Sequence, residues 1–299
     1  MNTSSETVRN APGIGAESAR AAPVRRLGVR GGRWVVYGLL VLLAIAALMP
    51  LYWMFTTSLK GQASYLAQPP EMFPANPTFA NFEQLFAHPN MIRWIANSLF
   101  VALSVTGLNL VFATLAGYAF AKLTFPGRRW LFWVYLATMM VPFQVTMFAL
   151  FKLMADIGWV NTFQALIIPA AALPYNVFLM RQFMQSLPNE ILDAGRIDGC
   201  GELTLVRRVV VPMSTNGLAV VGIFTFITTW NNFLWPLLVL NTEEMRTLPI
   251  ALASFQSRNE TDYGLLMAGG VVMAIPMFII FLIFQRYFLQ GVTFGALKG

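Results

Sequence analysis

The side chains that carry most enzymatic and metal chemistry are scarce in this sequence. Among 299 residues, His88 is the single histidine and Cys200 is the single cysteine. A Ser-His-Asp or Cys-His mechanism therefore has at most one candidate base, and no His/Cys cluster has the spacing of metal ligands. The sequence also lacks a phosphate-binding G-x-x-x-x-G-K-[ST] motif, so we expect it to bind neither ATP nor another cofactor by itself. We predict no catalytic residues and no metal site.

A dense group of charged and turn-forming residues lies between about residues 184 and 213. From Pro188 to Ile197, apolar residues recur at three- and four-residue spacing, and Glu190 suits a helix amino terminus, which predicts a short amphipathic helix. Asp198-Gly199 is a helix-stop signal, because glycine adopts positive φ without steric cost. A second short helix is expected from about Glu202 towards Pro212. The pattern predicts a helix-turn-helix, although periodicity alone leaves open a connector that lies on a membrane surface.

The elements that must position this loop are strongly apolar. Hydrophobic residues make up 57% of the chain and charged residues 11%, against roughly 25% charged in soluble domains. Segments of about 20 apolar residues can cross a bilayer as helices. We therefore predict an all-α polytopic membrane protein with six transmembrane helices. The expected spans are Trp34 to about Leu59, Ile92 to Lys122, Trp130 to Met154, Phe163 to Phe183, Ser214 to Leu240 and Tyr263 to Leu289.

The distribution of positive charge predicts the orientation of these spans. With the amino terminus inside, fifteen Lys and Arg residues lie on the cytoplasmic side and five on the opposite side, which satisfies the positive-inside rule. Both termini should therefore be cytoplasmic, with the loop at about 184–213 between spans 4 and 5 on the same side. Residues 1–31 are predicted to be a disordered basic tail beside anionic lipid, and the net charge of +7 does not indicate nucleic acid. A cleaved signal peptide ending near Ala44-Ile45-Ala46 is less consistent with the apolar run that continues to Phe55.

Several polar side chains lie inside the predicted spans. A polar group in a bilayer is costly unless it faces a cavity or another helix, so each one marks either a solute pathway or helix packing. The pathway candidates are Asn97, Gln144, Trp230, Asn231 and Asn232, with Asn109 and Asn176 as further intramembrane amides. Gly269-Gly270 favours close helix packing rather than a site.

The run from Pro188 to Gly199, with Pro212 downstream, resembles the cytoplasmic "EAA" loop of ABC importer permeases of the carbohydrate type, the maltose and glycerol-phosphate permease class. Four further runs agree with that class and extend the resemblance over residues 34–299. They are Trp230 to Leu237, Phe125 to Arg128, Pro50 to Trp53 with Ser58 to Lys60, and Gly291 to Gly299. The family usually has Glu-Ala-Ala where this chain has Asp193-Ala194-Gly195. Since Gly stabilises a helix by about 1 kcal/mol less than Ala does, this departure predicts a looser loop.

The resemblance implies that residues 32–299 form a permease domain in the cell inner membrane. ATP and magnesium would be bound by two separate ATPase subunits, and the loop would dock on one of them. The implied coupling residues are Glu190, Asp193, Ala194, Gly195, Asp198, Gly199 and Pro212. Further implied partners are a second related permease, an extracytoplasmic solute-binding protein and a sugar substrate.

Other functions are left open by the residues alone. A polar non-sugar such as glycerol 3-phosphate or a polyol is the alternative substrate, although no Lys or Arg clearly lies in mid-span to bind a phosphate. A six-span membrane enzyme would need an acidic or histidine cluster that the spans do not supply. A channel subunit without ATP coupling is a third possibility.

Overall fold

The computed structural model describes residues 30–61, 71–256 and 262–296. These residues form helices joined by loops, with no β-strand among them. The chain divides into two compact units, residues 1–49 and 50–299. The predicted disordered tail, residues 1–31, lies outside the described residues except for the start of the first helix. In the first unit, the side chains from Arg33 to Met49 are all exposed, as a helix that faces lipid or a partner requires.

Three of the predicted spans are continuous apolar helices long enough to cross a membrane. They are α1 (Arg30–Ser58), α4 (Met91–Lys122) and α15 (Tyr263–Ala296). The carboxyl end of α1 is held in the second unit by α3 (Ala80–Ala87), because Asn81 Nδ2 donates to the carbonyls of Ser58 and Lys60, each at 2.8 Å. Such contacts satisfy carbonyl groups that the end of a helix leaves without partners.

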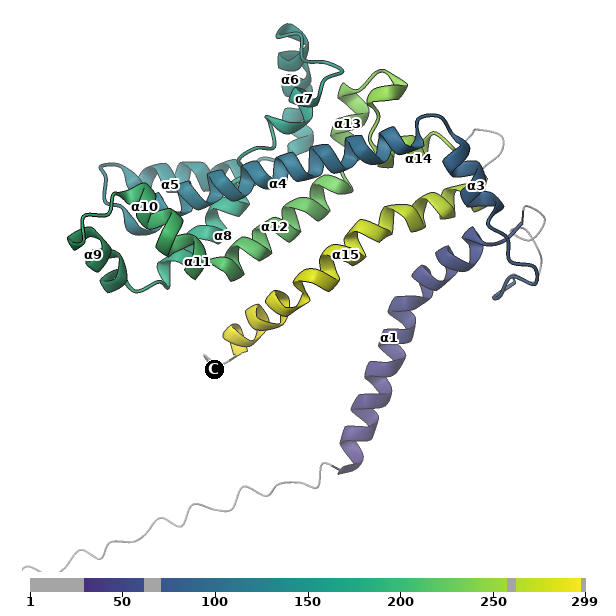
Figure 1. The fold of residues 1–299 in the computed structure, drawn as a ribbon, viewed down its shortest axis with the longest axis horizontal. Helices are drawn as coiled ribbons and strands as arrows, with labels where there is room; N and C mark the ends of the chain where they lie inside the picture. The colour runs from purple at the N-terminus through teal and green to yellow at the C-terminus, as the bar shows by residue number, and fades with distance from the viewer. Residues whose placement is uncertain (1–29, 62–70, 257–261, 297–299) are drawn as a thin grey trace, which may run out of the picture. The chain divides into compact units, whose positions relative to one another are not determined.

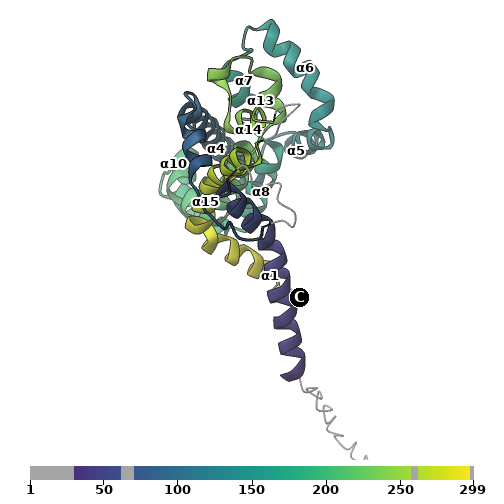
Figure 2. The same cartoon turned by 90° about the vertical axis from the view of Figure 1, so that its right-hand side faces the viewer.

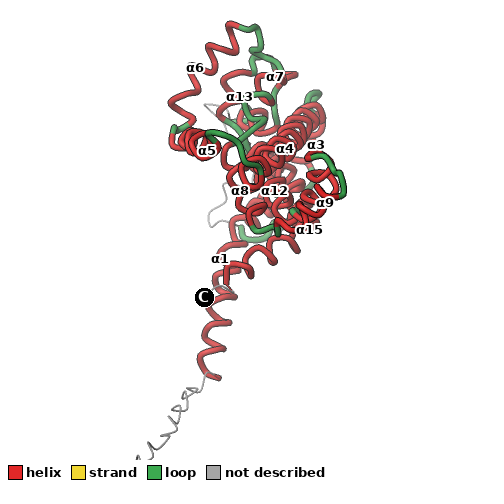
Figure 3. The backbone as a smooth tube through the Cα atoms, turned by 90° about the vertical axis from the view of Figure 1, so that its left-hand side faces the viewer, coloured by secondary structure: helices red, strands yellow, loops and turns green. Residues whose placement is uncertain are grey.

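The third predicted span is bent rather than straight. It consists of α5 (Arg128–Ala137) with the short turn η1 (Thr138–Met140), and α6 (Phe143–Asp156). The axes of the two parts differ by 97° (Figure 3). Pro142 lies directly before α6 in extended conformation, and a proline disfavours helix in the residue before it. The hydropathy of the segment predicted a crossing but could not predict this bend.

The fourth and fifth predicted spans are also interrupted. The fourth contains α7 (Phe163–Ile167) and α8 (Pro174–Gln185), separated by an irregular segment. The fifth contains α12 (Thr215–Trp230) and α13 (Leu234–Val239), separated at Asn231. By length and composition, the described residues supply three spans, or up to five if two bent pairs each count as one span, namely Arg128–Met140 with Phe143–Asp156 and Glu202–Met213 with Thr215–Trp230. The total of six and the cytoplasmic placement of both ends remain predictions.

In the second unit, α4 is the helix around which the others pack. It contacts α8, α12, α14 (Leu248–Ala253) and α3 (Figures 1 and 2), and it contributes to all three hydrophobic clusters. Gly117 allows α8 to approach closely, since a Cβ there would lie 2.8 Å from Met180 Cβ. Gly269 and Gly270 lie against Leu252 and Met54 in the same way, so the prediction that they serve helix packing is confirmed.

A buried amide network fixes the break between α7 and α8. Asn109, on α4, donates from Nδ2 to the carbonyl of Ala170 at 2.6 Å and accepts from Leu173 N–H at 2.9 Å. Asn176 Nδ2 donates to Asn109 Oδ1 and to Thr225 Oγ1, both at 2.9 Å. These bonds satisfy backbone groups that the interrupted helix leaves open. Asn109 and Asn176 therefore take the interhelical role.

Candidate functional site

The loop between α8 and α12 folds as the predicted helix-turn-helix. Its first helix, α9 (Asn189–Ile197), begins after Pro188, which is in extended conformation. The helix ends where Gly199 adopts φ +80°, and Cys200 N–H donates back to the carbonyl of Gly195 at 3.0 Å. This left-handed carboxyl-terminal turn is the one that glycine favours. The prediction that Asp198-Gly199 stops the helix is confirmed.

The second half of the loop is one continuous helical run. It consists of α10 (Glu202–Leu205), the π-helical turn η2 (Val206–Val210) and α11 (Val211–Met213). Pro212 lies in α11 and has no N–H to donate to the preceding turn, and the turn before it is widened. The chain then bends by 82° into α12. The predicted helix from Glu202 towards Pro212 is confirmed, while the π-turn was not predicted.

A charged cluster joins the two halves of the loop to the carboxyl end of α4. Arg196 donates from Nη1 to Asp193 Oδ1 and from Nε to Glu202 Oε1, each at 2.8 Å. Tyr118, on α4, donates its hydroxyl hydrogen to Glu202 Oε2. The hydrogen bonds that Arg196 donates to Glu202 and Asp193 raise the pKa of Arg196 above its ordinary value, so this guanidinium stays charged. The sequence placed Asp193 at the site. It did not predict that Arg196 would pair with Asp193 and Glu202.

Lys122 makes a second connection between α4 and the loop. Its Nζ donates to the carbonyl of Leu187 at 2.6 Å and to Asn189 Oδ1 at 2.7 Å. Lys122 is the last residue of α4, and Asn189 is the first of α9. The loop is thus attached to α4 immediately before its first helix and again at Arg196 near the end of that helix.

Gly195 has a packing role that sequence reasoning missed. A Cβ at this position would lie 2.5 Å from Leu205 Cδ2, and Leu205 is only 1% exposed. The glycine therefore lets α9 and α10 come into close contact. Gly195 therefore leaves room for the Leu205 side chain, a packing role that helix propensity does not include.

The loop presents apolar side chains outward. Ile191 is 42% exposed, Ile197 86% and Leu203 72%, whereas Leu192 is buried and anchors α9 to the body of the protein. Ile191 and Ile197 belong to the face that the spacing predicted, but the buried contact is made by Leu192 instead. Glu190, Ala194 and Asp198 are exposed as well. In Figure 1, α9 and α10 lie at one end of α4.

The pathway candidates differ in burial and in hydrogen-bond partners. Asn97 is buried and donates to the carbonyls of Glu244 and Arg246, at 2.8 and 2.9 Å. Trp230 is buried, stacks on Phe226 and donates to the carbonyl of Met273. Both side chains therefore hold helices and loops together.

The remaining three candidates are more accessible. Gln144, at the start of α6, and Asn232, after α12, are exposed. Asn231 is half-buried and donates from Nδ2 to the carbonyl of Ile227 at 2.8 Å and to Met277 S at 3.1 Å.

At the opposite end of α4, the segment around η3 (Glu243–Met245) is fixed to the first turns of that helix. Trp94 Nε1 donates to the carbonyl of Glu243 at 2.8 Å, and Ser98 Oγ accepts from Leu248 N–H at 2.7 Å. His88 Nε2 lies 3.4 Å from Glu243 Oε1. The side chains of Glu243 and Glu244 remain exposed. The single histidine thus lies in a loop contact, and among the described residues no group of three or more His, Cys, Asp or Glu side chains could hold a metal ion.

Comparison with known proteins agrees with this geometry. Residues 109–294 match the family model described as binding-protein-dependent transport system inner membrane component. The arabinooligosaccharides transport system permease AraQ of Halalkalibacterium halodurans is 40% identical over 76% of this chain and 81% of its own. The diacetylchitobiose uptake system permease DasC of Streptomyces coelicolor is 32% identical over 87% of this chain and 95% of its own.

The fold is also that of a solved transporter. A chain in the crystal structure of a bacterial ABC transporter that imports the acidic polysaccharide alginate matches with a TM-score of 0.79 at 23% identity. The match covers 89% of this chain and all of that chain. The helical architecture, the matched residues and the two permease relatives lead to one assignment: the chain belongs to the family of binding-protein-dependent transport system inner membrane components, and is a permease subunit of an ABC importer.

Proposed function

We propose that this permease forms part of the pathway by which a sugar, most simply an oligosaccharide, enters the cell. Two relatives with different substrates, arabinooligosaccharides and diacetylchitobiose, carry oligosaccharides according to their names. The amide side chains of Asn231 and Asn232, at the end of α12, can hydrogen-bond a polyhydroxyl solute. Gln144, Asn231 and Asn232 are the side chains proposed to meet the solute, while Asn97 and Trp230 position the helices around them.

The proposed topology has six spans, with both termini and the loop at 184–213 in the cytoplasm. The charge bias supports this orientation. It places α9 and α10 on the inner side and the segment around Glu243 on the outer side. The outer segment would then meet the solute-binding protein, and the loop would meet an ATPase subunit. A second permease would complete the pathway.

The observation that carries the coupling role is the double attachment of the loop to α4. Arg196 and Glu202 connect the loop to Tyr118, and Lys122 binds it at Leu187 and Asn189. Outward-facing Ile191, Ile197 and Leu203 offer an apolar surface to a partner. Movement of an ATPase subunit against this surface would therefore be transmitted to α4 and to the helices packed on it. ATP and magnesium stay in the partner, and this chain supplies no catalytic group.

The test is substrate-stimulated ATPase activity of the reconstituted four-subunit complex with its binding protein. We expect stimulation by an oligosaccharide and not by glycerol 3-phosphate. Asp193→Lys should abolish stimulation, because it places a positive charge beside Arg196. Asp156→Lys, at an exposed position at the end of α6, is the matched charge reversal and should leave stimulation intact. Full stimulation in Asp193→Lys, with normal assembly, would contradict the coupling role.

A further inference from the structure

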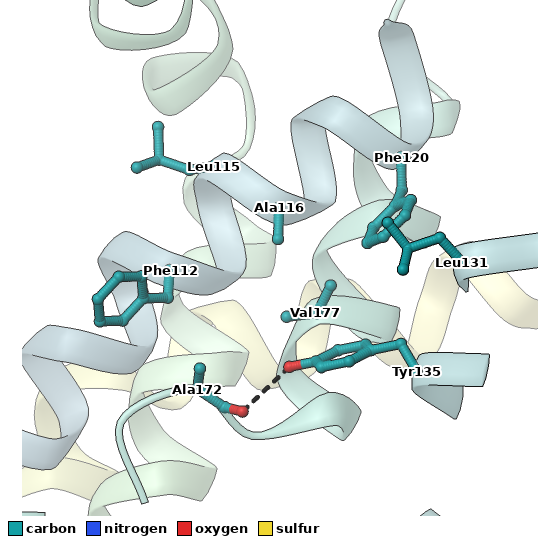
Figure 4. Close-up of a pocket in the computed structure, with 8 residues that line it drawn as sticks. All are labelled: Phe112, Leu115, Ala116, Phe120, Leu131, Tyr135, Ala172 and Val177. Carbon is teal, nitrogen blue, oxygen red and sulfur yellow. Dashed lines mark hydrogen bonds between the residues drawn. The ribbon is translucent and has the colours of Figure 1, made fainter. Parts of the chain in front are cut away.

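Two adjoining cavities lie on one side of α4, α5 and α8. One, of about 370 Å³, is lined almost wholly by apolar side chains from Phe112 to Phe120 on α4, by Leu131 and Tyr135 on α5, and by Ala172 and Val177. Figure 4 shows these side chains around the opening. The Tyr135 hydroxyl donates to the carbonyl of Ala172 at 3.0 Å, so its polar atom is already satisfied. We name this cavity the apolar slot.

The second cavity, of about 490 Å³, contains three arginines. Arg128 and Arg129 come from the start of α5, and Arg181 comes from α8. Phe120 lines both cavities, and the neighbouring residues of α5 and α8 continue from one into the other. We name this cavity the arginine pocket. On α8, the arginine pocket is lined by Phe178, Arg181 and Gln182, which are closer in sequence to the loop at 184–213 than Val177 of the apolar slot.

The three arginines have no carboxylate partner within the described part of the chain, where the ion pairs involve only His88 and Arg196. The Arg181 guanidinium lies 4.1 Å from the centre of the Phe132 ring and donates from Nε to the carbonyl of Phe120. Arg128 donates from Nη1 to the carbonyl of Leu123. Each guanidinium has five N–H donors, so most donors remain free for an anion.

The surroundings identify the kind of anion. Trp130 is 71% exposed and Trp133 is 60% exposed, next to the pocket on α5, and exposed tryptophans are typical of a membrane interface. On the slot, Phe112, Leu115 and Leu131 are between 40 and 47% exposed, so the slot opens outward from the helices. A free phosphate would use the arginines alone, whereas a phospholipid would use both cavities together.

We propose that these cavities bind one anionic phospholipid, with its phosphate in the arginine pocket and an acyl chain in the apolar slot. The assignment of this lipid to the inner leaflet rests on the proposed orientation of the permease. The binding of the lipid to the two cavities does not depend on that orientation. The lipid would rest against α4 and α8, the helices that hold the coupling loop. Each arginine near a headgroup favours an anionic lipid by about fivefold.

The experiment measures lipid retention by the purified, ATPase-active transporter, with native mass spectrometry during exchange between phosphatidylglycerol and phosphatidylcholine. We expect the transporter to retain phosphatidylglycerol preferentially, and Arg129→Gln with Arg181→Gln to lower that preference about 25-fold. Arg129 is exposed, so Arg129→Gln alone tests the site without disturbing buried packing, with an expected fivefold loss of preference. Arg93→Gln, an exposed arginine at the other end of α4, should have no effect.

Two further arms separate the alternatives. Ala116→Phe fills the apolar slot and should reduce phosphatidylglycerol retention, and inorganic phosphate should not compete with the lipid. A photoreactive phenylalanine at Leu131 should cross-link to lipid. Four results would each overturn the proposal. They are equal retention of both lipids, an unchanged preference in the double variant, competition by inorganic phosphate, and a cross-link from Leu131 to the second permease. ATPase stimulation by sugar is recorded on the same samples, so failure of the lipid site is distinguishable from failure of the transport function.

Discussion

At the scale of single residues, Gly195 shows how packing can reverse an expectation based on helix propensity. Its neighbours Asp193 and Ala194 are exposed, but Gly195 lies against the buried side chain of Leu205. An alanine would favour α9 by about 1 kcal/mol. Displacing Leu205 from a filled space would cost about 1–3 kcal/mol.

We therefore expect Gly195→Ala to destabilise the loop, measured by hydrogen exchange of residues 189–205. In a Leu205→Ala background, the same change should become stabilising by about 1 kcal/mol, because the obstructing side chain is gone. Gly107→Ala, on α4 with open space around the new Cβ, is the matched control and should not reduce protection. Equal stabilisation by Gly195→Ala in both backgrounds would show that propensity outweighs packing.

At the scale of elements, the interrupted helices are the features that hydropathy could not predict. The sequence indicated apolar segments at 130–154, 163–183 and 214–240, but a hydropathy profile does not record direction. The breaks depend on Pro142 and Pro174 and on distant amides such as Asn109. The Asn109 side chain hydrogen-bonds backbone groups of the irregular segment before α8. The prolines are visible in the sequence and disfavour helix in the residue before them, whereas the partner of each freed backbone group depends on tertiary contacts.

Asn109→Ala should destabilise the permease by about 1–3 kcal/mol, since it leaves Leu173 N–H without its acceptor and Asn176 with one partner fewer. The check is thermal unfolding of the purified complex. Asn232→Ala, at an exposed position, is the matched control and should leave the transition unchanged. A transition of Asn109→Ala that matches the control would mean that the network does not hold the break.

The coupling loop was the part of the site that could be predicted best. Its helices and its turn depend on local signals, namely Pro188, Gly199 and Pro212, which act within a few residues. Its attachment through Tyr118 and Lys122 depends on residues more than sixty positions away, and no pattern in one sequence brings them together. The hydrogen bonds that hold Asn97 and Trp230 likewise join residues far apart in the sequence.

At the scale of the whole molecule, the single cysteine tests the proposed topology. Cys200 is a free thiol, half-buried directly after Gly199. In the proposed orientation it faces the cytoplasm, so a membrane-impermeant maleimide should label it in inside-out vesicles and not in right-side-out vesicles. Thr242→Cys in a Cys200→Ser background should show the opposite pattern. Labelling of Cys200 from outside would reverse the orientation.

The central claim is that the loop at 184–213 is the contact through which an ATPase subunit drives the permease, and Ile197 tests it most directly. This side chain is 86% exposed, so Ile197→Asp should not affect folding of the permease itself. The measurement is the amount of ATPase subunit that co-purifies with the permease, compared with Phe79→Asp, another exposed apolar position. We expect Ile197→Asp to lose most of the ATPase subunit while Phe79→Asp retains it. Equal retention by both variants, with normal substrate-stimulated ATPase activity, would contradict the claim.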